Sequence, residues 1–297
     1  MNTLTRLAYA KINLTLDVGP RRPDGYHDIR SVMQTIALHD TVSVTLDRVP
    51  GVHLTVTGDE AVGVPTDETN LVHKAAVRLQ KIAAARGIRA GNESGLQIVL
   101  DKHIPSQAGL GGGSSDAAAA LLAVNKLFSL ALSQAQLSEI GAALGADVPF
   151  FLTGGTALAE GLGEQIKPLP PLSPSWPLVI VKPNSGVSTA AAYAALDAVP
   201  NRTTSGATQR WLQDRRVISN DFERVILPAY PEVAAAYHLF SQTTDEGESF
   251  KPLLCGSGAA LFLRASSKEA AEQIAAQVRA AGIGIWVTET IGAAVQE

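Results

Sequence analysis

The chain has 297 residues, a formal net charge of −4 and an ordinary globular composition, with 46% hydrophobic and 18% charged residues. This balance excludes an intrinsically disordered chain, and the lack of a lysine- or arginine-rich run argues against nucleic acid as a partner. The single cysteine, Cys255, excludes an intramolecular disulfide, and no apolar stretch is long enough to cross a membrane. We therefore expect a soluble cytoplasmic protein of two domains, either a monomer or a homodimer.

The first half of the chain mixes strand and helix patterns. Apolar and polar residues alternate strictly over 8–18, which predicts a half-buried strand. Alternation returns on both sides of Pro50-Gly51, which predicts a hairpin or a meander there. The predicted strands lie at 8–18, 41–47, 52–57, 96–100 and 156–159, and the predicted helices at 70–86, 115–128 and 133–144.

Prolines mark the best candidate for a domain boundary. Five of them interrupt regular structure over 166–177, so we expect an N-terminal domain at 1–168 and a C-terminal domain at 169–297. Beyond the boundary the predicted strands lie at 178–181, 261–263 and 283–287, and the predicted helices at 188–196 and 266–282. Hairpins and strand runs mixed with helix runs predict the α+β class rather than a doubly wound parallel sheet.

A glycine-rich loop over 105–115 is the strongest local feature, with Gly-Leu-Gly-Gly-Gly-Ser-Ser placed directly before a helix. Glycines allow close backbone approach, and a helix start offers free N–H groups, so the loop is suited to hold phosphates. No lysine follows the glycines as a Walker A motif requires, and a serine replaces the third glycine of the dinucleotide fingerprint. A flexible turn with capping serines is the alternative, but it rarely needs three consecutive glycines.

Two charged positions are candidates for chemistry. Lys11 and Asn13 lie on the same polar side of the first predicted strand, although composition alone favours a lysine that faces water. Asp147 follows a predicted helix, where it is either a turn or capping carboxylate or a general base oriented by a cation such as Lys11. Sequence spacing alone does not bring the two residues together.

Three motifs, taken in order, resemble the signature motifs of the GHMP small-molecule kinases. They are Ala-Lys-Ile-Asn-Leu at 10–14, the glycine loop at 105–118 and Cys-Gly-Ser-Gly-Ala at 255–259. The segments at 22–27, 109–115, 144–149 and 220–223 resemble the branch of that superfamily whose substrate is 4-diphosphocytidyl-2-C-methyl-D-erythritol. The similar segments extend from about residue 8 to residue 263. Cys255 departs from the usual Ser or Thr of the third motif, and we expect it to be a small packed residue.

The resemblance implies both a fold and a reaction. The fold would be that of the GHMP kinases, with an N-terminal domain like ribosomal protein S5 domain 2, a ferredoxin-like C-terminal domain and the active site between them. The reaction would use ATP and Mg²⁺ to phosphorylate the 2-hydroxyl of the cytidyl substrate, a step in the non-mevalonate route to isoprenoid precursors.

The resemblance also implies residue roles. Asp147 would be the general base, and Lys11 would orient it. The cytidyl substrate would contact Asn13, Tyr26, His27, Thr189 and Tyr193. The ATP phosphates would be held by Pro105, Ser106, Gln107, Ala108, Gly109, Leu110, Gly111, Gly112, Gly113, Ser114 and Ser115, with Ser115 also a candidate ligand of Mg²⁺.

Two other functions are compatible with the sequence. One is another GHMP kinase of the mevalonate or homoserine type, against which the segment Gly-Tyr26-His27 and the triple glycine argue. The other is a non-catalytic ATP-binding sensor of the same fold, which would have no need of both Lys11 and Asp147.

Overall fold

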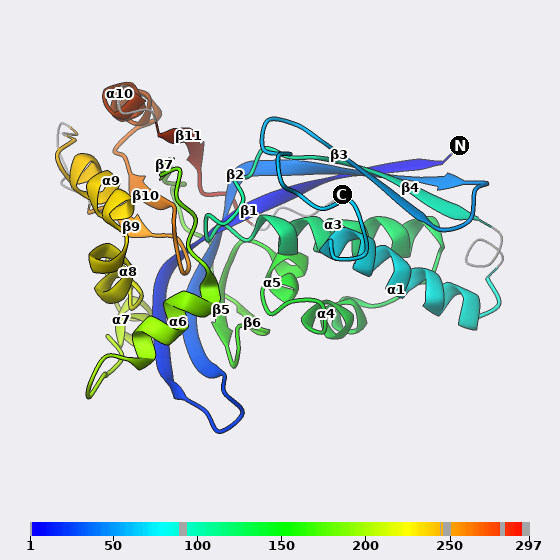
Figure 1. Ribbon diagram of the computed structural model, residues 1–297, viewed down its shortest axis with the longest axis horizontal. Coiled ribbons are helices and arrows are strands. Elements are labelled where there is room, and N and C mark those ends of the chain that lie inside the picture. Colours follow the sequence, from blue (N-terminus) through cyan, green and yellow to red (C-terminus); the bar gives the residue numbers. More distant parts are fainter. Residues whose placement is uncertain (1, 89–93, 244, 246–250, 280–282, 293–297) are drawn as a thin grey trace.

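Two β-sheets organise the computed structural model, which describes residues 2–88, 94–243, 245, 251–279 and 283–292. The first sheet carries the N-terminal half of the chain, and the second carries most of the C-terminal part (Figure 1). The last strand of the first half ends at Pro168 and the next strand begins at Pro177, so the chain passes between the sheets in the proline-rich segment.

The first sheet is built on two long antiparallel strands, β1 (Thr3–Arg21) and β2 (His27–Asp47). Its main strand order is β3-β4-β2-β1-β8, and β5 and β6 continue it from another part of β2. The shorter strands are β3 (Val52–Thr57), β4 (Gly95–Asp101), β5 (Thr156–Glu160), β6 (Gln165–Pro168) and β8 (Ser219–Asn220).

The hairpin or meander predicted around Pro50-Gly51, which would pair β2 directly with β3, is wrong. Strand β4 lies between β2 and β3, antiparallel to β2 and parallel to β3. Between β3 and β4 the chain forms helix α1 (Leu71–Ala85), whose apolar stripe packs in the core of this half. Parallel neighbours need such a crossover, so the helix between the strands, rather than the turn before β3, decides the pairing.

Four helices cover one face of the first sheet (Figure 1): α1, α3 (Gly112–Leu127), α4 (Gln134–Ala142) and α5 (Val148–Thr153). Helix α3 is rich in buried alanines and lies against β1, β2 and α1. Helix α4 begins with the predicted capping box, in which the side chains of Ser133 and Gln136 each accept from the other residue's backbone N–H.

The second sheet is antiparallel, in the order β11-β7-β10-β9. Its strands are β7 (Pro177–Lys182), β9 (Leu253–Leu254), β10 (Leu261–Arg264) and β11 (Gly284–Glu289). The helices of this part of the chain are α6 (Thr189–Asp197), α7 (Ala207–Trp211), which contacts β1 and β2 of the first sheet, α8 (Glu223–Ala229), α9 (Pro231–Ser241) and α10 (Lys268–Arg279). Helix α10 starts two residues later than predicted, and its predicted last residues, 280–282, lie outside the described part of the chain.

The middle of β1 contacts both halves of the molecule, and both of its faces are buried. The half-buried strand expected at 8–18 is therefore wrong in its burial. Its apolar face, including Ile12 and Leu14, packs against β7 and β10 in a third core cluster. Its polar face is buried as well, because the chain around α7 covers it: the Asp17 carboxylate accepts from the backbone N–H groups of Ala207 and Thr208. The polar side chains of β1 therefore face the junction between the two sheets rather than water.

Candidate active site

A cavity of about 870 Å³ opens at this junction. Strand β1 and the start of β2 form one wall, the glycine loop and the start of α3 a second, and the turn before α5 a third. Helix α6 and the turn at Gly256-Ser257 contribute from the C-terminal half. Residues separated by more than 200 positions thus face one space.

The glycine loop presents the start of α3 to this cavity. Gly111 precedes the helix with φ of +73°, and a Cβ there would stand 2.6 Å from the Phe151 ring, so only glycine fits. The first N–H groups of a helix have no carbonyl partner within it, and those of residues 112–114 open α3. The result is a set of amides at the positive end of a helix dipole, which suits an anionic group.

The turn of the third motif supports the glycine loop from behind. The backbone N–H groups of Ala259 and Ala260 donate to the carbonyls of Gln107 and Ala108, at 3.2 Å each. The approach is so close that a Cβ on Gly109 would stand 1.9 Å from the carbonyl oxygen of Cys255. Cys255 itself is fully buried, and burial raises the pKa of its thiol to about 12, in agreement with the packed residue expected from the sequence.

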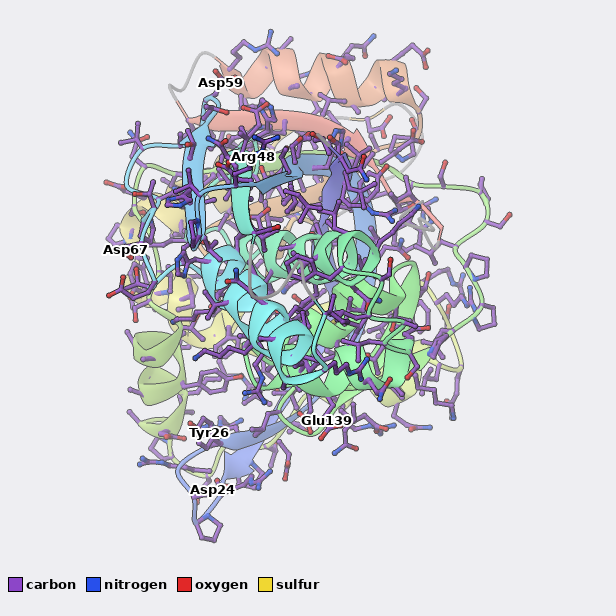
Figure 2. The ribbon with its side chains drawn as sticks, turned by 90° about the vertical axis from the view of Figure 1, so that its right-hand side faces the viewer. Asp24, Tyr26, Arg48, Asp59, Asp67 and Glu139 are labelled. Carbon is purple, nitrogen blue, oxygen red and sulfur yellow. The ribbon has the colours of Figure 1, made fainter. Side chains whose placement is uncertain are left out.

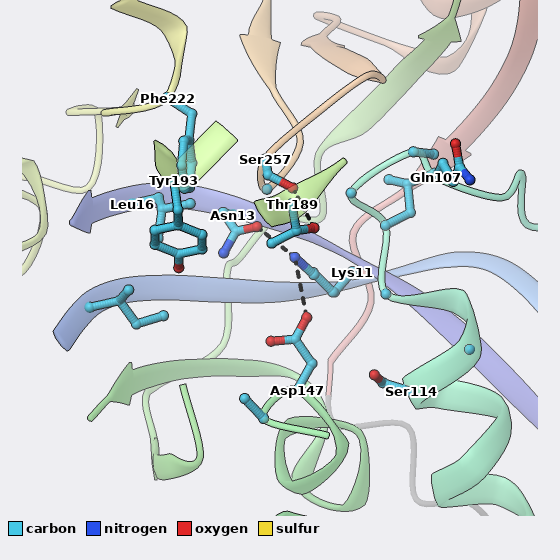
Figure 3. A pocket seen from close by; sticks show the side chains of 18 of the residues that line it. Lys11, Asn13, Leu16, Gln107, Ser114, Asp147, Thr189, Tyr193, Phe222 and Ser257 are labelled. Carbon is cyan, nitrogen blue, oxygen red and sulfur yellow. Dashed lines mark hydrogen bonds and ion pairs between the residues drawn. The ribbon is translucent and has the colours of Figure 1, made fainter. Parts of the chain in front are cut away.

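Lys11 and Asp147 meet in the middle of the cavity (Figure 3). The Lys11 Nζ lies 3.7 Å from the Asp147 Oδ2 and donates to the Asn13 Oδ1 at 2.7 Å. Asn13 in turn donates to the Ser31 hydroxyl at 2.7 Å, which fixes the amide. Lys11 is only 4% exposed, so the reading of a lysine that faces water is wrong. The paired geometry holds a cation beside a carboxylate that lines the cavity.

A buried charged triad lies beneath the glycine loop, and the sequence did not reveal it. Lys102 donates to the carboxylates of Asp40 and Asp116, and a Cβ on Gly112 would stand 3.3 Å from the Lys102 Nζ. Burial opposes the charge on Lys102, yet the two carboxylates outweigh it and raise the pKa of Lys102 above its ordinary value. Asp40 also accepts from two backbone N–H groups of the segment that leads into the loop, at His103 and Ile104. The triad anchors that segment at the floor of the cavity.

Aromatic side chains gather at the other end of the cavity. Tyr193 of α6 stacks on the His27 ring with centroids 4.8 Å apart and meets the edge of Phe222 at 5.0 Å. Burial, and then the charge of Asp147, raise the pKa of Tyr193 to about 12, and its hydroxyl end is turned toward the part of the cavity that holds Asp147 (Figure 3). Tyr26 is 62% exposed and lies near the tip of the protruding β1–β2 hairpin, beside Asp24 (Figure 2).

All but one of the site residues expected from the sequence line this cavity. The exception is Ser115, whose hydroxyl is buried and donates to the Tyr9 carbonyl at 2.6 Å, so it points away from the cavity and does not support the expected role as a Mg²⁺ ligand. The preceding residue, Ser114, does line the cavity, because one step along a helix turns a side chain by about 100°.

Comparison with known proteins shows which family shares these features. Residues 70–155 match the family model described as the GHMP kinases N-terminal domain. The chain is 43% identical to 4-diphosphocytidyl-2-C-methyl-D-erythritol kinase of Moorella thermoacetica over 98% of this chain and 100% of that one. It is also 43% identical to the enzyme of the same name from Geobacter metallireducens, over 91% and 92% of the two chains. The chain belongs to the 4-diphosphocytidyl-2-C-methyl-D-erythritol kinase family. It is an ATP-dependent small-molecule kinase.

Solved structures agree with this family. A crystal structure of 4-(cytidine 5'-diphospho)-2C-methyl-D-erythritol kinase superposes with a TM-score of 0.73 at 32% identity, over 97% of this chain and 100% of that one. Homoserine kinase from Cytophaga hutchinsonii superposes with a TM-score of 0.70 at 20% identity, over 98% and 95% of the chains. The second likeness shows the GHMP kinase fold alone, which confirms the fold class expected from the sequence. Within the described residues, no helix is both long and apolar enough to span a bilayer.

Several residues that line the cavity were not predicted from the sequence. Ser257 stands in the quoted third motif, and its hydroxyl lies 3.0 Å from that of Thr189, at the start of α6 in the same half of the chain. Lys102 comes just before the second motif, and its position next to the loop is the signal that was available. Asp197 lines the cavity from the end of α6, and nothing in its sequence context distinguishes it from a surface carboxylate.

Proposed function

We propose that this kinase transfers the γ-phosphoryl group of ATP to the 2-hydroxyl of 4-diphosphocytidyl-2-C-methyl-D-erythritol. The observation that carries the proposal is that one continuous cavity contains an amide-lined helix start, the Lys11–Asp147 pair and an aromatic end. A substrate with a nucleobase at one end and an alcohol at the other fits this order of features.

In the proposed reaction, Asp147 accepts the proton of the 2-hydroxyl as its oxygen attacks the γ-phosphorus. The bond between that phosphorus and the β,γ-bridging oxygen breaks, and ADP leaves. Lys11 lies 3.7 Å from the carboxylate, so it orients Asp147 and places a positive charge beside the developing phosphoryl charge. Positioning and charge stabilisation of this kind account for most of the catalysis in phosphoryl transfer.

We propose the ten residues 105–114 as the holder of the ATP phosphates, through the backbone amides at the start of α3. Mg²⁺ is bound by phosphate oxygens and water with only one or two protein ligands, and it supplies charge neutralisation when present. The Ser114 hydroxyl lines the cavity on the element that faces Asp147, and one such oxygen fits an ion that takes so few protein ligands (Figure 3). We therefore propose Ser114 in place of Ser115 as the hydroxyl ligand.

At the aromatic end we propose that Tyr26 and Tyr193 hold the cytosine ring and that His27 faces its edge. Tyr193 is already fixed by its ring contacts with His27 and Phe222, whereas no ring pairs with Tyr26 among the described residues. Tyr26 is thus free to close over a base. Thr189 and Asn13 lie between this end and Lys11, where they would contact the diphosphate and the methylerythritol unit.

The deciding experiment is a coupled ADP-release assay on the purified protein with three acceptors: the cytidyl-methylerythritol substrate, mevalonate and homoserine. We expect turnover with the cytidyl substrate only. Turnover with mevalonate or homoserine in its place would assign the chain to a sibling activity, and ATP binding without turnover of any of the three would favour the sensor.

A further inference from the structure

His27 has a carboxylate partner that none of the roles above uses. Its Nε2 lies 2.7 Å from the Oδ1 of Asp197, the last residue of α6, across 170 positions of sequence. The His27 side chain is 4% exposed and the Asp197 side chain 28%, so the contact is largely shielded from water. Both residues line the cavity.

The contact determines which nitrogen of the ring carries the proton. An aspartate carboxylate only accepts hydrogen bonds, so the Nε2 must be the N–H that donates to it. In a neutral imidazole the other nitrogen, Nδ1, is then an acceptor. No described residue forms a hydrogen bond to Nδ1. The ring therefore keeps one acceptor for a ligand.

Two further contacts prevent the ring and the carboxylate from turning. Tyr193 covers the face of the His27 ring at 4.8 Å with an interplanar angle of 25°, so the ring cannot tilt. Arg21 approaches the second oxygen of Asp197, with the Nε 3.8 Å from the Oδ2. A flip of the imidazole would put the Cε1 carbon in the place of the Nε2–H that faces Asp197, and the hydrogen bond would be lost.

We propose that Asp197 is a positioning residue that holds His27 in its Nε2–H form and thereby makes the site select cytosine over uracil. The inference rests on the proposed function, since it concerns the same base-binding end. Cytosine carries an exocyclic amino group that donates a hydrogen bond, and uracil carries a carbonyl oxygen at the same position. An acceptor at Nδ1 matches the amino group and opposes the carbonyl, which gives discrimination without any charged contact to the base.

Asp197→Asn tests the proposal, because an amide of nearly the same shape can donate to Nε2 and release the ring to its other tautomer. We expect kcat/KM for the cytidyl substrate to fall roughly 10- to 100-fold. We also expect the preference for the cytidyl substrate over its uridyl analogue to fall by at least about tenfold, because one hydrogen-bonding mismatch is relieved. The KM for ATP, bound at the other end, should not change. The matched control is Asp214→Asn, which removes an exposed carboxylate paired with Arg216 outside the cavity.

The tautomer of His27 is also measurable in the unmodified protein by ¹⁵N NMR of the imidazole, with His27→Gln to assign the signals. We expect a protonated Nε2 and an unprotonated Nδ1 at pH 8. The Nδ1–H tautomer or a doubly protonated ring would overturn the proposal, as would an Asp197→Asn enzyme with unchanged base preference. If the wild-type enzyme does not phosphorylate the cytidyl substrate at all, the proposed function fails instead, so the two failures are distinct.

Discussion

The two ends of the cavity are built in different ways. At the end proposed to hold the phosphates, the ten residues 105–114 are contiguous, and their backbone would supply most of the binding groups. At the base end, Tyr26 and His27 come from the β1–β2 hairpin, whereas Tyr193 and Asp197 come from α6 in the other half of the chain. The first end is held by glycines and a buried charged triad, and the second by side-chain contacts between two sheets.

This difference separates binding from chemistry. Lys11 lies between the two ends, buried and hydrogen-bonded, and in the proposed reaction the chemical step takes place there. The base end includes an exposed tyrosine on a protruding hairpin, so changes there should alter substrate affinity more than turnover. The phosphate end depends on close backbone contact with the third motif, so changes there should affect both ATP affinity and folding.

The largest effect is expected in the middle, from Asp147→Asn. Loss of a general base typically costs 10²- to 10⁴-fold in rate, so kcat should fall within about that range while ATP affinity is largely kept. Turnover in the ADP-release assay and ATP titration by calorimetry measure the two quantities. A variant with near-normal kcat would refute the assignment of Asp147 as the base.

At the phosphate end, Gly109→Ala should destabilise the fold by about 2–5 kcal/mol, because it combines a left-handed backbone with a severe contact. The φ of Gly109 is +75°, and the added Cβ would lie 1.9 Å from the Cys255 carbonyl oxygen. ATP affinity should fall as the loop and the third motif separate.

Gly113→Ala is the matched control for stability, since a Cβ there meets nothing within 4 Å. In helix α3 it should raise stability slightly, by up to about 1 kcal/mol. Chemical denaturation of both variants makes the comparison, and equal losses in the two would show that close approach at Gly109 is unimportant.

At the base end, Tyr26→Ala should raise the KM for the cytidyl substrate with little change in kcat or in the KM for ATP. Loss of one aromatic–base stack is worth about 1–3 kcal/mol, which corresponds to roughly 5- to 150-fold in affinity. Steady-state kinetics with each substrate varied in turn tests this. If ATP affinity fell instead, the two ligands would be placed at the wrong ends.

The smallest effect is expected from Glu223, which lies behind the base end. It follows Phe222, the residue whose ring contacts Tyr193, and its carboxyl group accepts from the Leu254 N–H. Burial raises the pKa of Glu223 to about 7, so the folded state holds a proton there that the unfolded chain releases above about pH 4.5. The contribution of this protonated carboxyl group to the free energy of unfolding is fully present at low pH. It is lost as pH rises through about 7, because the buried group must then become charged. The melting temperature of Glu223→Gln should therefore be a few degrees above that of the wild type at pH 8.5, and the two should converge at pH 5. The control is Glu139→Gln, at an exposed position of α4, whose melting temperature should follow that of the wild type at both pH values.

Local patterns were enough for much of the fold. The alternation of β1, the capping box at Ser133 and the glycine-rich start of α3 are interactions between near neighbours in sequence, and all three appear in the structure. The pairing of β2 with β3 was predicted wrongly, because a turn signal describes two adjacent segments and not that β4 inserts between them. Helices α8 and α9 were not predicted at all, since packing on the second sheet stabilises them.

The same division holds for the site. The order of the motifs and the types of their residues were enough, without any structure, to predict a phosphate loop, an acid–base pair and an aromatic contact for a base. Only the tertiary structure decided that Lys11 is buried beside Asp147, that Ser114 rather than Ser115 lines the cavity, and that Asp197 holds His27. The physical reason is that residue type and local spacing specify what a side chain can do. Distances between distant segments, and the burial that strengthens their contacts, arise only when the two sheets pack together.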